Sequence, residues 1–228
     1  EHVSIPAVDP EGLSDWYAHT LGVETTSNGD SDGVDGDAAS VECGATTLEF
    51  QAAAEPAPQH LALRTPADID ALAAWLAERA TIHPIEGAQS RRFEFLDADA
   101  VYVADGAGNV LECLCYDGDA AESLAGGVPI AGVTEVGLPA PDVLALVEWL
   151  ESAVGLSAWG SPSESFAWVG DRGARFVVLP AGSEWYPTEQ VADSEPISAT
   201  VVDSDATPGT YEHPELPYEI VSFNRSIN

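Results

Sequence analysis

The sequence contains no lysine and only seven arginines, against 39 aspartate and glutamate residues, which gives a formal net charge of −32 over 228 residues. A field of this sign repels nucleic acid and anionic membranes, so we expect neither as a partner. Salt screens such repulsion, over roughly 10 Å at 0.1 M. We therefore predict an acidic, halophilic protein whose stability rises with salt. Single surface carboxylates then say little about function.

Cysteines and long apolar runs are also scarce. There are three cysteines, two of them in Cys113-Leu-Cys115, and they are expected to be buried reduced thiols rather than a disulfide framework. No run is long enough to span a membrane, and no basic, apolar secretory segment opens the sequence. These absences predict a cytoplasmic protein.

The stretch from Phe95 to Tyr116 is the most informative part of the sequence. Two strand-forming runs flank Asp105-Gly-Ala-Gly-Asn109, whose residues accept positive φ, so a hairpin is predicted. In its second strand Glu112 shares a face with Val110 and Leu114. A carboxylate buried among apolar side chains needs a cation or a metal as a partner, unless it reaches water at a strand edge.

An order of strand, helix and three strands recurs along the chain. The first unit starts at His2-Val-Ser-Ile, the second at His60-Leu-Ala-Leu and the third at Glu135-Val-Gly-Leu, each followed by a predicted helix. A fourth unit has strands near 197–202 and 218–223 but no amphipathic helix between them. With 45% hydrophobic residues, the chain suits two domains, residues 1–120 and 128–228, separated by a Gly- and Ala-rich linker.

These segments resemble the vicinal oxygen chelate superfamily, which includes glyoxalase I, extradiol dioxygenases, fosfomycin-resistance enzymes and bleomycin-binding proteins. The resemblance covers nearly the whole chain. Its motifs are His2-Val-Ser-Ile with Trp16-Tyr-Ala-His-Thr-Leu-Gly22, His60-Leu-Ala-Leu, and Tyr102-Val-Ala-Asp-Gly-Ala-Gly-Asn-Val-Leu-Glu112. It implies an α+β fold of paired βαβββ modules with curved mixed sheets. It also implies two tandem glyoxalase-like domains, the second with an incomplete last module.

The resemblance also implies a metal site whose ligands come from the first and last strands of the modules. His2, Glu49, His60 and Glu112 fall on those positions in the first domain. Two imidazoles with one or two carboxylates suit a divalent Fe, Ni, Zn, Co or Mn ion. Each residue also has a structural interpretation, as a terminal or hydrogen-bonded histidine or a solvated glutamate.

The second domain departs from the ligand pattern and is predicted to bind no metal. Glu135 stands where His2 stands, Ser198 stands near the His60 position, a valine at 177 or 178 stands near the Glu49 position, and only Glu219 matches Glu112. We expect this half to cover the first-domain pocket. Trp159, Trp168, Trp185 and Tyr186 are candidates to line it, with core packing as the alternative.

Two weaker candidates lie elsewhere. The acidic stretch from Asp30 to Asp37 resembles a calcium loop but lacks the EF-hand spacing, and a solvated loop is the simpler interpretation. His83, beside Pro84 near a strand end, is a candidate acid or base.

The leading functional hypothesis is a metal-dependent lyase or isomerase of the glyoxalase I type, acting on a small vicinally oxygenated substrate, with Glu112 or Glu49 as the base. One alternative is an extradiol ring-cleaving dioxygenase with Fe(II) on His2, His60 and Glu112. Another is a non-catalytic small-molecule binding or resistance protein. A monomer and a homodimer both remain open.

Overall fold

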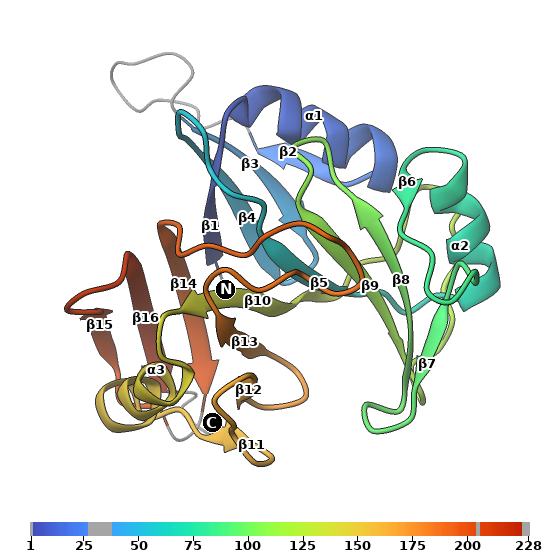
Figure 1. Ribbon diagram of the computed structural model, residues 1–228. Helices are drawn as coiled ribbons and strands as arrows, with labels where there is room; N and C mark the ends of the chain where they lie inside the picture. Colours follow the sequence, from blue (N-terminus) through green and yellow to red (C-terminus); the bar gives the residue numbers. More distant parts are fainter. Residues whose placement is uncertain (1, 27–37, 204–205, 225–228) are drawn as a thin grey trace.

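A computed structural model describes residues 2–26, 38–203 and 206–224, so the acidic stretch from Asp30 to Asp37 lies outside the described residues. The described chain forms two mixed β-sheets with helices packed against them (Figure 1). No helix in these ranges is long and apolar enough to cross a membrane.

Four consecutive units make up the chain. The first contains β1 (His2–Ala7), α1 (Pro10–Leu21), β2 (Glu24–Thr26), β3 (Ala38–Cys43) and β4 (Thr46–Ala52). The second contains β5 (His60–Arg64), α2 (Ile69–Ala77), β6 (Thr81–Ile82), β7 (Arg91–Phe93), β8 (Ala98–Ala104) and β9 (Val110–Tyr116). The third contains β10 (Gly132–Ala140), α3 (Val143–Trp149) with a π-helical turn η1 (Leu150–Val154), β11 (Ala158–Trp159), β12 (Ala167–Gly170) and β13 (Arg175–Pro180). The fourth contains only β14 (Ile197–Asp203), β15 (Gly209–Glu212) and β16 (Tyr218–Asn224) among its described residues. The predicted α+β class, with an incomplete last unit, is confirmed.

The helices begin in the same way in all three units. Asp9, Asp68 and Asp142 are the N-caps of α1, α2 and α3, and each carboxylate accepts a 3.0 Å hydrogen bond from the backbone N–H three residues later. Such caps satisfy amide groups that have no partner within the helix. The shared cap supports the repeat seen in the sequence.

The units pair in an order that differs from their order along the chain. The first sheet has the strand order β15-β16-β14-β1-β4-β3-β2, so β1 of the first unit pairs antiparallel with β14 of the fourth. The second sheet runs β11-β12-β13-β10-β5-β9-β8-β6, so β5 of the second unit pairs antiparallel with β10 of the third. In Figure 1 the dark blue β1 accordingly lies beside the orange β14. Each sheet therefore contains strands from both halves, and neither sheet coincides with residues 1–120 or 128–228.

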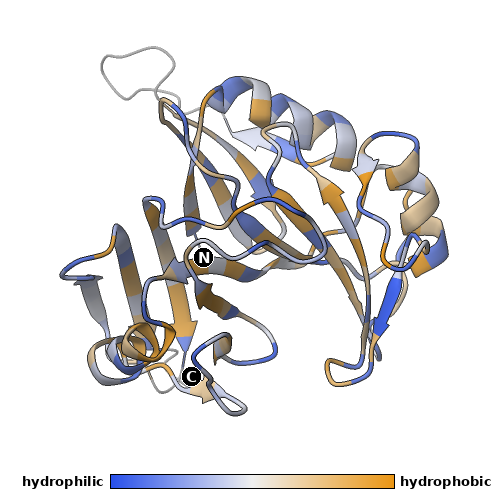
Figure 2. Ribbon diagram, in the orientation of Figure 1, coloured by the Kyte–Doolittle hydropathy of each residue, from blue (hydrophilic) through white to orange (hydrophobic). Residues whose placement is uncertain are grey.

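One continuous apolar core joins both sheets to the helices. Val3 and Leu48 of the first sheet belong to the same cluster of buried residues as Leu61, Leu111 and Val136 of the second. Apolar and polar residues alternate along the strands (Figure 2). The opposite face of the second sheet carries a separate, aromatic-rich cluster, and the candidate site lies on this face.

Candidate metal centre

Three buried side chains meet on this face because their strands are neighbours in register. Strand β5 lies between β9 and β10, and its Ala62 pairs with Glu112 on one side and with Glu135 on the other. His60 lies two residues before Ala62 and therefore shares its face. His60, Glu112 and Glu135 are 5%, 3% and 4% exposed, so none of these polar groups is solvated as a surface residue would be.

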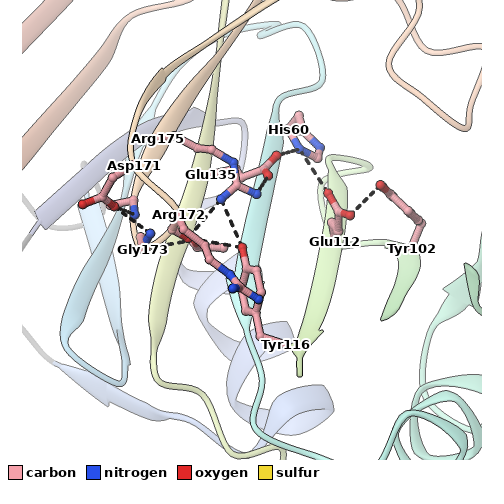
Figure 3. Close-up of polar contacts among 11 residues, drawn as sticks. His60, Tyr102, Glu112, Tyr116, Glu135, Asp171, Arg172, Gly173 and Arg175 are labelled. Carbon is pink, nitrogen blue, oxygen red and sulfur yellow. Dashed lines mark hydrogen bonds and ion pairs between the residues drawn. The ribbon is translucent and has the colours of Figure 1, made fainter. Parts of the chain in front are cut away.

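Each carboxylate uses one oxygen for an outer partner and turns the other toward His60 (Figure 3). Glu135 Oε2 lies 3.4 Å from His60 Nε2, while its Oε1 forms an ion pair with Arg175. Glu112 Oε2 lies 3.7 Å from the same nitrogen, while its Oε1 accepts a 2.6 Å hydrogen bond from the Tyr102 hydroxyl. One imidazole nitrogen and two carboxylate oxygens thus face one another, all within 4.8 Å.

This arrangement fits a divalent cation. Ligand atoms bound at about 2.1 Å lie roughly 3.0 to 3.4 Å apart around a metal, close to the two spacings from His60 Nε2. Outer hydrogen bonds that orient the ligating carboxylates are typical of such centres. Across residues 2–26, 38–203 and 206–224, no second group of three His, Cys, Asp or Glu side chains converges in this way.

The protonation of the two glutamates is unequal. Burial, and then the charge of Glu135, raises the pKa of Glu112 to about 7, although His60, Tyr102 and Arg175 oppose the shift. Burial also acts to raise the pKa of Glu135, but the hydrogen bond with His60 and the charge of Arg175 outweigh it and hold that pKa below its ordinary value. Near neutral pH, Glu135 is therefore the firmly ionised member of the pair, and Glu112 exchanges a proton.

Arg175 is the buried cation of the site. It pairs with Glu135 in the register of β10 and β13, and its side chain is fully buried. Its guanidinium also donates to the Tyr116 hydroxyl at 3.1 Å and packs against the rings of Trp159 and Trp168. These contacts hold Glu135 in one orientation, because a planar guanidinium fixes the geometry of its partners.

A tight turn positions the strand that carries Glu112. The Asp105 carboxylate accepts backbone hydrogen bonds from Ala107 and Asn109 at 2.9 Å, and another from the Asn109 side chain. Asn109 Oδ1 in turn accepts the backbone N–H of Gln59, directly before His60. Gly108 has a φ of 86°, a conformation that glycine adopts without strain. The motif thus ties β9 to β5 and fixes Glu112 relative to His60.

A cavity of about 390 Å³ opens over these groups. His60, Glu112 and Glu135 line it, and most of the other lining side chains are aromatic. These are Phe93, Phe95, Tyr102, Phe166, Trp168, Trp185 and Tyr186. The Trp185 ring stacks on His60 with 5.5 Å between centroids. Trp168, Trp185 and Tyr186 thus line the cavity, whereas Trp159 does not line it and packs against Trp168. His83 lies just after β6 and does not line it.

The structure brings together two of the four residues selected from the sequence and pairs the other two elsewhere. His60 and Glu112 meet as described. His2 and Glu49 lie together on the first sheet, where His2 Nε2 is 3.5 Å from Glu49 Oε2, and Glu49 also contacts Ser4 and Gln51. The reason is the strand pairing, because β5 lies beside β10 rather than beside β1.

The residues matched from the second half also divide between the sheets. Glu135 joins His60, and Val177 lines the same cavity. Ser198 and Glu219 are on the first sheet, where the Ser198 hydroxyl donates to Glu219 Oε1 at 2.9 Å.

Sequence reasoning did not select Glu135, Arg175 or Tyr102 for the site. The sequence feature that points to Glu135 is the same as for Glu112: a carboxylate lies within an apolar strand, here Val133-Thr-Glu-Val-Gly-Leu138. Arg175 was visible as a rare cation before Phe176-Val-Val-Leu179. Cys43, Cys113 and Cys115 are free and buried, which confirms the prediction for the thiols.

Comparison with known proteins identifies the fold. No protein-family model matches the chain, and no curated protein matches it. A solved structure described as a "putative dioxygenase" from Bacillus subtilis superposes with a TM-score of 0.62 at 17% identity, covering 97% of this chain and 84% of that one. A V278E mutant of glyoxalase I from Zea mays gives a TM-score of 0.54 at 13% identity, covering 97% and 91%. The chain therefore shares the fold of these two solved structures, which is consistent with the predicted resemblance to the vicinal oxygen chelate superfamily.

Proposed function

We propose that this protein is a metal-dependent lyase or isomerase of the glyoxalase I type, acting on a small substrate with oxygens on adjacent carbons. The observation that carries the proposal is that the two oxygens of each carboxylate have different partners. One oxygen of Glu112 and one of Glu135 is held by an outer donor, and the other faces His60 Nε2. Two carboxylates buried this close together are stabilised when a cation lies between them.

His60, Glu112 and Glu135 would hold the metal. When bound, a divalent ion would supply Lewis-acid polarisation of two neighbouring substrate oxygens. Within the described part of the chain three protein donors converge, which would leave positions for the oxygens of the substrate. Arg175 keeps Glu135 ionised and in place, and the aromatic walls make the surroundings of the three ligands largely apolar.

Glu112 is the proposed proton-transfer group. A base works best when its pKa lies near the working pH, and burial beside Glu135 raises the pKa of Glu112 to about 7. It would remove a proton from one substrate carbon and return it to the adjacent carbon. Tyr102 fixes the carboxylate through its 2.6 Å hydrogen bond. Glu135, paired with Arg175, is the poorer base, and Glu49 lies on the other sheet.

An extradiol dioxygenase is the second candidate. Non-haem Fe(II) oxygenases of this kind use two histidines and one carboxylate, whereas the present donors are one histidine and two carboxylates. This donor set favours redox-neutral proton transfer. A binding protein without metal would leave two buried carboxylates with a single arginine, and Glu112, with a pKa of about 7, would be only partly ionised at neutral pH.

The test is metal content by elemental analysis after purification in high salt without chelator. One bound divalent ion is expected in the wild type, and His60→Ala and Glu135→Gln should lose most of it. Glu219→Gln and Glu49→Gln, which change carboxylates on the other sheet, should retain it. Loss of metal in the Glu219 variant as severe as in the His60 variant would refute the assignment.

Activity is tested separately on the thiohemiacetal formed from a 2-oxoaldehyde and a neutral thiol. Glu112→Gln should lower turnover by a factor of about 100 or more, because the group that moves the proton is lost. Oxygen-dependent cleavage of an aromatic diol, with no isomerisation, would favour the dioxygenase.

A further inference from the structure

Among the described residues no arginine or lysine lines the cavity, so apart from a bound metal it offers no cation to an anionic ligand. The sequence has no lysine, and each of the six arginines that the structure describes already has a carboxylate partner. None of the six lines the cavity, whereas Glu112, Glu135 and Glu184 do. An anionic group that lay among the aromatic rings, away from the His60–Glu112–Glu135 group, would lose its hydration without a compensating charge, which is costly in an apolar site.

Two groups of aromatic rings line the cavity. Tyr102 and Tyr186 pack edge to face at 5.8 Å between centroids, and Phe93 lies 6.4 Å from each. On the opposite side, Trp168 lies 4.9 Å from Phe166. A cavity walled by rings on two sides favours a flat apolar group between them.

Phe95 connects the two groups across the boundary between units. It follows β7 in the turn before β8, and its ring lies 5.7 Å from Phe93 and 5.4 Å from Trp168 of the third unit. Yet 62% of Phe95 is exposed, as are 49% of Tyr186 and 37% of Phe166. Exposed aromatic side chains gathered around one cavity mark a binding surface rather than a core.

We propose that the cavity selects a neutral substrate bearing an aromatic ring, or a comparably flat apolar group, and rejects anionic substrates, including thiol conjugates that carry carboxylates. Phe95 is its specificity-determining residue, and the oxygens of the substrate point toward Glu112 and Glu135. The inference rests on the proposed function for this last orientation. The preference for neutral rings follows from the lining of the cavity.

The experiment compares the binding of three probes to the metal-supplemented protein in molar KCl by titration calorimetry. The probes are benzene-1,2-diol, its carboxylated analogue 3,4-dihydroxybenzoate, and the aliphatic butane-2,3-diol. The neutral aromatic diol should bind at least about tenfold more tightly than either of the others, a difference of about 1.4 kcal/mol. Equal binding of the carboxylate and the neutral diol would overturn the inference.

Two variants test the residues. Phe95→Ala should weaken binding of the aromatic diol by about two- to tenfold without changing that of the aliphatic diol, because only ring contacts are lost. Phe223→Ala, which removes another exposed aromatic residue on β16, is the matched control and should change neither. Glu184→Arg places a cation at the cavity and should raise the affinity for the carboxylated analogue. No gain in Glu184→Arg, or equal effects of the two phenylalanine variants, would contradict the proposal.

A repeat of the titrations with chelator separates this inference from the proposed function. If the protein binds no metal but still prefers the neutral ring, the proposed metal-dependent function fails and the proposed selectivity of the cavity is retained. If the protein binds metal and also binds the anionic analogue tightly, the proposed selectivity fails and the proposed metal site is retained.

Discussion

Replacement of Arg175 by methionine should destabilise the metal-free protein by about 3 to 5 kcal/mol, the cost of leaving one partner of a buried ion pair behind. The Arg175 side chain is fully buried and that of Glu135 is 5% exposed, so water cannot take the place of the guanidinium. The variant also loses the hydrogen bond to Tyr116 and the contacts with two tryptophan rings. A loss of this size is a large part of the roughly 5 to 15 kcal/mol that stabilises a typical domain.

The measurement is urea unfolding in molar KCl with chelator, followed by tryptophan fluorescence and circular dichroism. The double variant Arg175→Met with Glu135→Leu should recover part of the loss, because no unpaired charge stays buried. Arg172→Met is the control, since that side chain is 47% exposed, 3.8 Å from Asp97, and its ion pair should contribute about 1 kcal/mol or less. A cost below about 1 kcal/mol for Arg175→Met, or a double variant no more stable than the single one, would refute the buried-pair reasoning.

Lowering the salt concentration from molar to millimolar should lower the melting temperature measured by circular dichroism, because the charge of −32 becomes unscreened. An unchanged melting curve would refute the halophilic interpretation. Metal affinity should rise with pH up to about 7 and then level off, because the metal must displace a proton from Glu112. Titrations from pH 5 to 8 measure this pH dependence, and Glu112→Gln should reduce it. Asp105→Ala should cost about 2 to 4 kcal/mol in urea unfolding, since it leaves amide groups of the β8–β9 turn without an acceptor, whereas the exposed Asp97→Ala should cost less than 1.

Much of the fold could be predicted because its signals are local. The helices start at aspartate caps and follow an apolar periodicity of 3.6 residues, as expected from Leu13, Tyr17 and Leu21 in α1. The β8–β9 hairpin forms around Asp105 to Asn109, and alternation places Glu112 on the face of Val110 and Leu114. Recurrence of the whole pattern indicated modules of one type.

The partners of the first strands could not be predicted in the same way. Which module's first strand pairs with which is a contact between distant residues, such as Val136 with Leu61 and Val3 with Ala199, and it depends on packing over the whole core. The family resemblance placed His2 and His60 in one site, because they hold matching positions in two successive modules. The segment from residue 53 to 59 instead takes the chain from the first sheet to the second.

The sequence by itself determined the module, its caps and turns, and the face on which His60 and Glu112 lie, since each depends on residues close together in the chain. Only the tertiary structure decided that Glu135 completes their group, that Arg175 holds it, and that His2 and Glu49 form a separate pair. The physical reason is that side chains meet across strands, and strand pairing is set by the burial of a core shared by all four units.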